Sequence, residues 1–168
     1  VDNNIQGTQS NANIVLVPNG TGAVEIRSNL TVSGTITASS ETTFNADVKF
    51  NTGVEEKFAT VTGASGVTAL DCANGHVFYK TGCTGDITAN FTNLGLTAEY
   101  ATNLTVIINQ GGTPYEVTAV QIGGASQTLN WQGGSAPTGN ANGIDAFSFT
   151  ILNDGGTFVV LGQMVDFT

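Results

Sequence analysis

Basic residues are scarce in this chain. Arg27, Lys49, Lys57 and Lys80 are its only cations, against 13 acidic residues, and the formal net charge is −9. Four cations cannot neutralise a row of phosphates, so we expect no nucleic-acid binding. An anionic membrane surface is disfavoured for the same reason. No run of 18 apolar residues is present, so the sequence also predicts no membrane insertion.

Cysteine is nearly absent. Cys72 and Cys83 are too few for a disulfide framework, and we interpret them as two buried free thiols. A bond between them is the less favoured alternative. Asn74-Gly75 resembles the two-residue turn of a β-hairpin, which would place Cys72 opposite Val77 and away from Cys83.

Sets of catalytic residues are missing too. The single histidine, His76, cannot build a zinc site within one chain, and three copies around an axis are a disfavoured alternative. No Gly-x-Ser-x-Gly elbow occurs, and no glycine-rich loop precedes a helix. Glu55-Glu56 lies in an extended segment, where adjacent side chains face opposite sides. We therefore interpret the pair as a solvated break between two parts of the chain and not as a pair of catalytic carboxylates. The sequence predicts no enzyme activity, no metal and no cofactor.

Residues typical of strands and turns are abundant instead. The chain has 22 Gly and is rich in Thr and Asn. Thr, Val, Ile and Phe favour pleated strands, whereas Gly and Asn favour the turns between them. Long runs of the best helix formers do not occur. The composition therefore predicts an all-β fold.

Residues 1–56 repeat one alternating pattern, with apolar residues at even positions and polar residues between them. A period of two predicts short strands with one buried face. Turn clusters at 18–22, 39–41 and 51–53 divide the segment. The side chains expected on the buried face include Leu16, Val24, Ile26, Leu30, Val32, Ile36, Phe44, Val48 and Phe50.

This buried face has nothing within the chain to pack against, because no amphipathic helix follows. About a dozen modest apolar side chains, at roughly 1.5–3 kcal/mol each, cannot offset the ordering of the whole segment at roughly 1–2 kcal/mol per residue. Three copies around a threefold axis would share one core. The sequence thus predicts a trimeric β-fibre or β-prism-like stem over residues 1–56.

The sequence pattern changes after residue 56. Residues 57–66 resemble a connection, and residues 67–168 have longer, more apolar candidate strands separated by glycine-rich turns. This spacing predicts a C-terminal antiparallel β-sandwich of jelly-roll type, large enough for a core built from Trp131 and most Phe residues. The candidate strands are 67–73, 76–81, 86–94, 103–110, 115–122, 126–132, 143–152 and 156–164.

Several motifs, in this order, resemble the tail fibres and virion fibres of tailed bacteriophages, especially of cyanobacterial and marine phages. The shaft repeats are matched by NANIVLVPNGTGAVEI at 11–26 and by NLTVSGTITASSETTFNADVKF, which starts at Asn29. The C-terminal domain is matched by VTALDCANGHVFYKTGCTGDITANFTNL, NLTVIINQGG, WQGGSAPT and IDAFSFTILNDGGTF. Cys72 and Cys83 depart from the apolar or Thr residues that are more usual at their positions.

The resemblance implies a homotrimer displayed on the virion together with other virion proteins. The stem would be a spacer, and the head would contact a host surface glycan or protein receptor. A purely structural virion protein, such as a head fibre, capsid decoration or neck appendage, is the alternative with the same fold.

Loops of the head supply the candidate receptor-binding residues, because a rigid sandwich can present loops to a partner. Their polar side chains offer adaptable hydrogen bonds to glycans or protein epitopes. We interpret Trp131 as a core anchor of its loop more than as a sugar-stacking platform. The candidates are Thr113, Tyr115, Gln132, Ser135, Thr138, Asn140, Asn142, Asn153 and Asp154.

Overall fold

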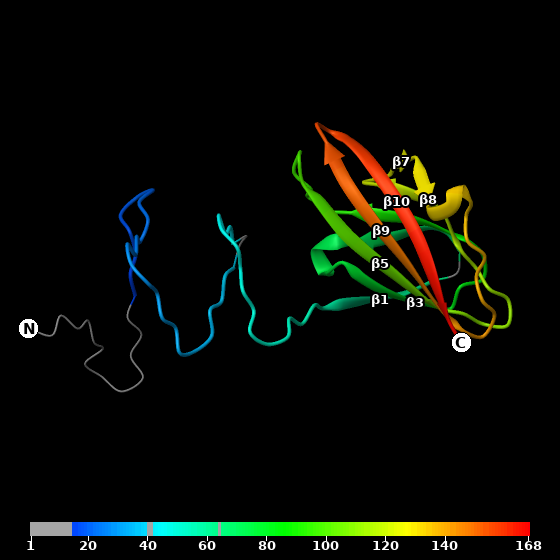
Figure 1. Ribbon diagram of the computed structural model, residues 1–168, viewed down its shortest axis with the longest axis horizontal. Helices are drawn as coiled ribbons and strands as arrows, with labels where there is room; N and C mark the ends of the chain where they lie inside the picture. Colours follow the sequence, from blue (N-terminus) through cyan, green and yellow to red (C-terminus); the bar gives the residue numbers. More distant parts are fainter. Residues whose placement is uncertain (1–14, 40–41, 64) are drawn as a thin grey trace, which may run out of the picture. The chain divides into compact units, whose positions relative to one another are not determined.

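The computed structural model describes residues 15–39, 42–63 and 65–168 (Figure 1). The chain separates into two compact units, Val1–Lys49 and Phe50–Thr168. The boundary precedes residue 56, where the predicted stem ends. Residues 1–14 of that stem and the turn at 40–41 lie outside the described residues.

The described part of the stem contains no strand, so the strands predicted there are wrong for the single chain. The nine side chains predicted to form its core are all exposed, from 42% for Val32 to 72% for Ile36. The physical reason for this exposure is the missing second layer, which the sequence already indicates. A lone copy offers neither a neighbouring strand for its backbone groups nor a second layer for its apolar face.

The second unit, hereafter the head, contains two β-sheets (Figure 1). In spatial order, the six-stranded sheet contains β1 (Phe58–Thr62), β3 (Val77–Thr81), β5 (Ala101–Asn109), β9 (Ile144–Asp154), β10 (Thr157–Phe167) and β8 (Leu129–Trp131). The four-stranded sheet contains β2 (Gly66–Asp71), β4 (Ile87–Thr92), β6 (Val117–Ile122) and β7 (Ala125–Gln127). Two short 3-10 turns, η1 (Cys72–Asn74) and η2 (Gln132–Gly134), complete it.

The strands alternate between the two sheets along the first half of the head. β1, β3 and β5 are parallel neighbours in one sheet, and β2, β4 and β6 are parallel neighbours in the other. The long β9–β10 hairpin then pairs antiparallel with β5. Five of the eight strand pairs in the described residues are parallel, so the predicted antiparallel sandwich is wrong in its pairing. The jelly-roll type, which requires antiparallel Greek keys, is not confirmed.

The reason for this difference is visible between β2 and β3. Asn74-Gly75 does not form a hairpin, because the chain crosses there from one sheet to the other. Asp71 caps η1 by accepting hydrogen bonds from the Ala73 backbone N–H (3.1 Å) and from Asn74 Nδ2 (3.0 Å). Gly75 has a φ of +126°, and a Cβ there would collide with the Lys57 carbonyl. The segment therefore forms an arch between sheets.

Part of the predicted connection at 57–66 is also a strand. Phe58–Thr62 forms β1, which lies at the edge of the six-stranded sheet and pairs in parallel with β3. Ala59 and Val61 of this strand pack against the core. Their small size and the short run explain why the sequence pattern is weak there.

Aromatic side chains join the two sheets. Phe91 of β4 lies between Phe78 of β3 and Phe149 of β9, with ring centroids 6.2 and 5.7 Å away. Trp131 of β8 packs beside Phe147 and Phe149 at 6.3 and 6.0 Å. The core thus includes residues from both sheets. Among the described residues there is no helix with the length and hydropathy needed to cross a membrane.

Both cysteines are free, as the sequence predicts, but only Cys72 is buried and Cys83 is half-buried. Burial, with a smaller effect of the Asp71 charge, raises the pKa of the Cys72 thiol to about 11. Burial also raises the pKa of Cys83, against an opposing effect of the Lys80 charge. A thiol with a raised pKa is a poor nucleophile at neutral pH.

Phe91→Ala is expected to destabilise the head by about 3–5 kcal/mol, because it removes the ring that joins the two sheets. Urea unfolding followed by the fluorescence of Trp131 measures the loss. Phe167→Ala is the matched control, since Phe167 is 56% exposed, and it should change the unfolding free energy by less than about 0.5 kcal/mol. Equal effects of the two variants would contradict the assigned core.

Alkylation of Cys72 by iodoacetamide should be slow in the folded chain and should accelerate with pH. At about pH 8, a pKa near 11 leaves roughly one thiolate in a thousand, so the rate should rise about tenfold per pH unit between about pH 7 and pH 10. Peptide mapping by mass spectrometry measures the rate at each cysteine. The urea-unfolded chain is the control, and a folded rate as fast as the unfolded one would refute the assignment.

Candidate functional site

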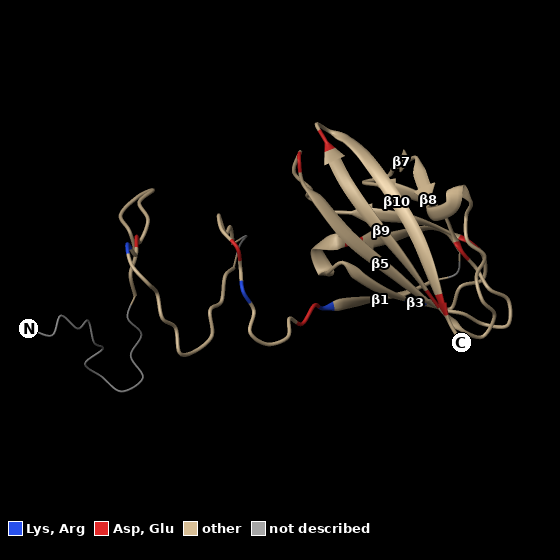
Figure 2. Cartoon of the chain, in the orientation of Figure 1, with Lys and Arg blue, Asp and Glu red and all other residues tan. Residues whose placement is uncertain are grey.

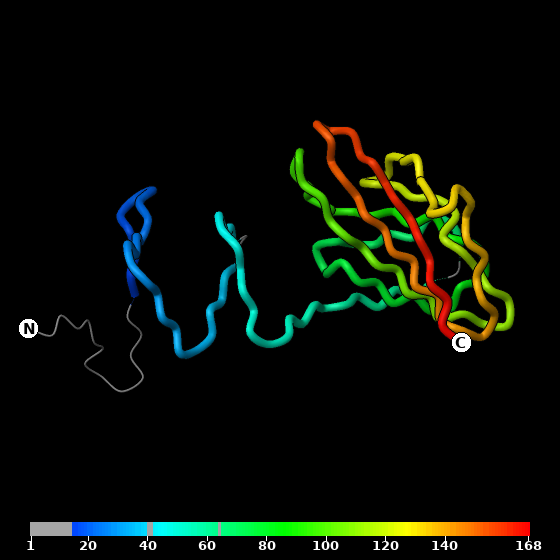
Figure 3. The backbone as a smooth tube through the Cα atoms, in the orientation of Figure 1, coloured from blue at the N-terminus to red at the C-terminus, as the bar shows by residue number. Residues whose placement is uncertain are grey.

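Most of the predicted receptor-binding residues lie at two opposite ends of the head. We call the end where β1 begins the near end and the end where β5 finishes the far end. The antiparallel pairing of β5 with β9 places the loops 110–116 and 135–143 at the far end and the β9–β10 turn at the near end (Figure 3). The 11 residues of β9 separate the two ends by about 33 Å. The nine candidates therefore do not form one site.

The far end brings most of the candidates together. Thr113, Thr138 and Asn142 are exposed there, and Tyr115 and Asn140 are half-buried. They belong to two loops that β6, β7 and β8 separate in the sequence and that a hydrogen bond joins in space. These loops are the larger of the two clusters of predicted residues.

Two buried polar side chains, Gln110 and Asp145, hold the far-end loops in place. Gln110 Nε2 donates to the Tyr115 carbonyl (2.6 Å) and to Asp145 Oδ2 (2.8 Å). Gln110 Oε1 accepts from the Tyr115 backbone N–H at 3.0 Å. The Asn140 backbone N–H donates to the same carboxylate oxygen of Asp145 at 2.9 Å. One carboxylate thus links both loops to β9.

A second link comes from Glu116, whose Oε1 accepts from the Gly139 backbone N–H at 3.0 Å. A Cβ at Gly139 would lie 3.0 Å from Asp145 Oδ2 and 3.1 Å from Pro114 Cβ, so a glycine is needed for this close approach. This network was not predicted from the sequence, because Gln110 and Asp145 are 35 residues apart. Polar residues within otherwise apolar strands are the only sequence signal for it.

The near end holds Asn153 and Asp154. Asn153 is wrong as a receptor-binding candidate, because its side chain is buried and engaged in the fold. Its Nδ2 donates to the Leu96 carbonyl (2.7 Å), and its Oδ1 accepts from the Gly156 backbone N–H (2.8 Å). Asp154 remains exposed and lines a groove of about 260 Å³ with Tyr100 and other residues.

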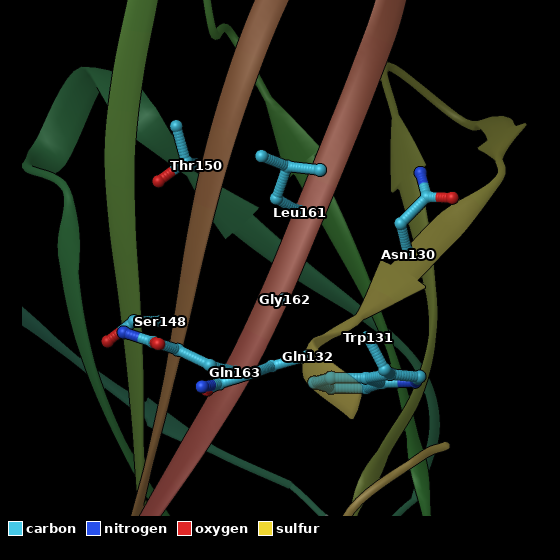
Figure 4. A pocket seen from close by; sticks show the side chains of 8 residues that line it. All are labelled: Asn130, Trp131, Gln132, Ser148, Thr150, Leu161, Gly162 and Gln163. Carbon is cyan, nitrogen blue, oxygen red and sulfur yellow. The ribbon is translucent and has the colours of Figure 1, made fainter. Parts of the chain in front are cut away.

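Gln132 belongs to a third place, an open groove of about 380 Å³ on the six-stranded sheet (Figure 4). We call it the β8–β10 groove. Ser135 is exposed in the loop that leads from there toward the far end. The groove is lined by Asn130, Trp131, Gln132, Ser148, Thr150, Leu161, Gly162 and Gln163.

Trp131 contributes to both the core and the groove. Its ring packs against the core, which agrees with its interpretation as a core anchor. A Cβ at Gly162 would lie 2.9 Å from Trp131 and from Leu129, so the glycine leaves room for both side chains across β10. The indole therefore supports the groove from beneath.

No group of three or more His, Cys, Asp or Glu side chains among the described residues is placed to hold a metal ion. His76 is half-buried, and its Nδ1 lies 3.1 Å from Thr102 Oγ1.

Comparisons with models of known protein families, with curated proteins and with solved structures found no match. The function is therefore inferred from the surfaces described above.

Asp145→Ala should loosen the far-end loops, because it leaves Gln110 Nε2 and the Asn140 N–H without their acceptor. We expect a loss of about 2–3 kcal/mol in unfolding free energy and faster hydrogen exchange at the Asn140 amide. Urea unfolding and exchange measured by NMR report the two effects. Asp154→Ala, at an exposed position, is the control, and an equally small effect of both variants would remove the proposed link.

Proposed function

We propose that this chain is the distal segment of a trimeric fibre on the virion of a tailed phage, and that its head attaches the virion to the host cell surface. The observation that carries the proposal is the exposed apolar row of the stem, from Leu16 to Phe50. The order of motifs that resembles phage fibres supports the same assignment.

The exposed apolar side chains of the stem indicate that it packs against other copies of the chain. Phe44 is 66% exposed and Leu30 is 64% exposed in the single chain. Isolated apolar side chains are normal on surfaces, but a regular row at alternate positions marks an interaction surface. In a threefold assembly the three rows pack on one another, and each backbone gains neighbours for its hydrogen bonds.

Two further apolar side chains, Val54 and Phe58, are 67% and 57% exposed within the head. Phe58 stands beside Tyr79, with ring centroids 6.5 Å apart, and the two line an apolar groove of about 240 Å³ with Val77 and Ile107. These exposed apolar side chains support a contact between copies at the β1 edge of the head.

The direction of the chain within the head supports an attachment role. β1, β3 and β5 all run toward the far end, so the far-end loops lie away from the point where the chain enters the head. Thr113, Thr138 and Asn142 are exposed on loops that Gln110 and Asp145 hold in place. Rigidly held polar loops suit a glycan or protein receptor.

Leu30→Asp and Val32→Asp should each abolish trimerisation, because three unpaired carboxylates would be buried near one axis. Thr31→Asp is the matched control, since residue 31 faces the opposite side of the same extended segment. Size-exclusion chromatography with light scattering should give about 52 kDa, three times 17.2 kDa, for the wild type and the control. A monomeric wild type, or trimeric Leu30→Asp and Val32→Asp variants, would overturn the trimer.

Attachment itself is tested by fluorescently labelled protein on candidate host cells, together with antibody labelling of intact virions in electron microscopy. Cell binding together with labelling of the tail fibres supports the proposal. Labelling of the virion without cell binding would instead support a purely structural virion protein.

A further inference from the structure

The outer face of the six-stranded sheet changes its chemistry from one edge to the other. Near β1 it is apolar, with Phe58 and Tyr79. Along the middle of β9 and β10 the outward side chains are uncharged and alternate with core residues such as Phe147 and Phe149. Ser148, Thr150 and Gln163 are polar, and apolar side chains such as Val159 and Val165 lie beside them. Figure 2 shows acidic residues near both ends of β9 and none along the middle of the β9–β10 hairpin.

Strand register gathers these polar side chains into the β8–β10 groove. Gln163 of β10 is the register partner of Ser148 of β9, and Leu161 stands between Thr150 of β9 and Asn130 of β8. These side chains come from three neighbouring strands, each about 4.8 Å from the next. Figure 4 shows the side chains of Gln132 and Gln163 approaching one another across β10. The groove volume of about 380 Å³ lies within the range of small-ligand sites.

Two of the groove side chains are held in place by the protein. Thr150 Oγ1 donates to Asn103 Oδ1 at 2.8 Å, and Asn130 Nδ2 donates to the Val160 carbonyl at 3.1 Å. Each donation leaves an oxygen on the same side chain that can accept from a ligand. Gln132 and Gln163 are exposed and offer both donors and acceptors. The groove is therefore partly organised before any ligand arrives.

The chemistry of the groove selects an uncharged ligand. None of its eight lining residues is ionisable. Of the four cations, Arg27 and Lys49 belong to the other unit, and Lys80 is buried with its Nζ donating to the Gly63 carbonyl. Lys57 directly precedes β1, at the opposite edge of the sheet from β8. An anionic ligand would find no counter-charge in the groove on a chain of net charge −9. Amides and hydroxyls match sugar hydroxyls, which also donate and accept, and Leu161, 45% exposed, offers carbon surface for a sugar ring.

We propose that the β8–β10 groove binds a neutral glycan, which rests on the proposed attachment function and names the receptor class. A second copy of the chain is the competing occupant of this sheet face. The groove extends from β9, three strands from β1, to β8, five strands from β1. That separation is about 14–24 Å, so a contact between copies at the β1 edge leaves the groove accessible.

Gln163→Ala and Gln132→Ala test this proposal, with Gln121→Ala on β6 of the other sheet as the matched control. The probe is a microarray of bacterial surface polysaccharides, sorted into neutral and anionic members. Wild type and control should capture neutral members, and each groove variant should bind about threefold to tenfold more weakly. Capture should change little between about 0.05 and 0.5 M salt, because no ion pair is formed.

Trp131 gives a second readout, since it is the chain's one tryptophan and lines the groove. Titration with a captured polysaccharide should shift its emission in the wild type, and the shift should weaken in parallel with affinity in the groove variants. Far-UV circular dichroism confirms that the variants are folded. Capture of anionic members alone, no capture at all, or unchanged capture by both groove variants would overturn the glycan groove.

Labelled host cells separate this proposal from the one that it rests on. Wild-type cell binding that the groove variants retain would overturn the groove and leave attachment standing. Cell binding that is lost on protease treatment of the cells would identify a protein receptor and would also overturn the groove. Absence of wild-type binding to the host would overturn attachment itself.

Discussion

The structure depends on one constraint: a strand with a single apolar face must have that face covered. In the head the two sheets cover each other, and Phe91 shows how, with Phe78 on one side and Phe149 on the other. In the stem the same alternation is present and no layer covers it, so Leu30 and Phe44 remain exposed in a single chain. The two units obey the same rule, and only the head meets it by itself.

Parallel winding of the head has a consequence for its surface. Because β1, β3 and β5 run the same way, their far ends gather the loops that follow β5 and precede β9. Gln110 and Asp145 then fix those loops through buried hydrogen bonds. A buried carboxylate is costly unless it is well bonded, and Asp145 Oδ1 has no partner within the described residues. Here the group orders a surface, which is consistent with the binding role proposed for these loops.

Much of the strand content of the head could be predicted from the sequence, because alternation shows which residues face inward. The predicted strand 143–152 overlaps β9 at all but its first residue, and 103–110 differs from β5 by only a few residues. Alternation does not show which strand is the neighbour, so the parallel pairing was missed. The hairpin predicted at Asn74-Gly75 failed for a local reason, because Asp71, three residues earlier, caps a turn there. The binding role predicted for Asn153 failed because its side chain bonds to Leu96, which is 57 residues away in the sequence.

The β8–β10 groove could not have been found from the sequence, since each of its polar residues is an ordinary outward-facing residue by itself. It exists because a parallel pair places β8 beside β10, and an antiparallel pair places β9 on the other side. Gly162 is equally necessary, because any larger residue would displace Trp131 from beneath the groove. One sheet face therefore carries the apolar groove of Phe58 and Tyr79 on its β1 side and, on its β8 side, a groove whose polar side chains have apolar neighbours such as Val165. The proposed contact between copies and the proposed glycan site use different parts of this face, because a surface buried between copies cannot also contact a ligand.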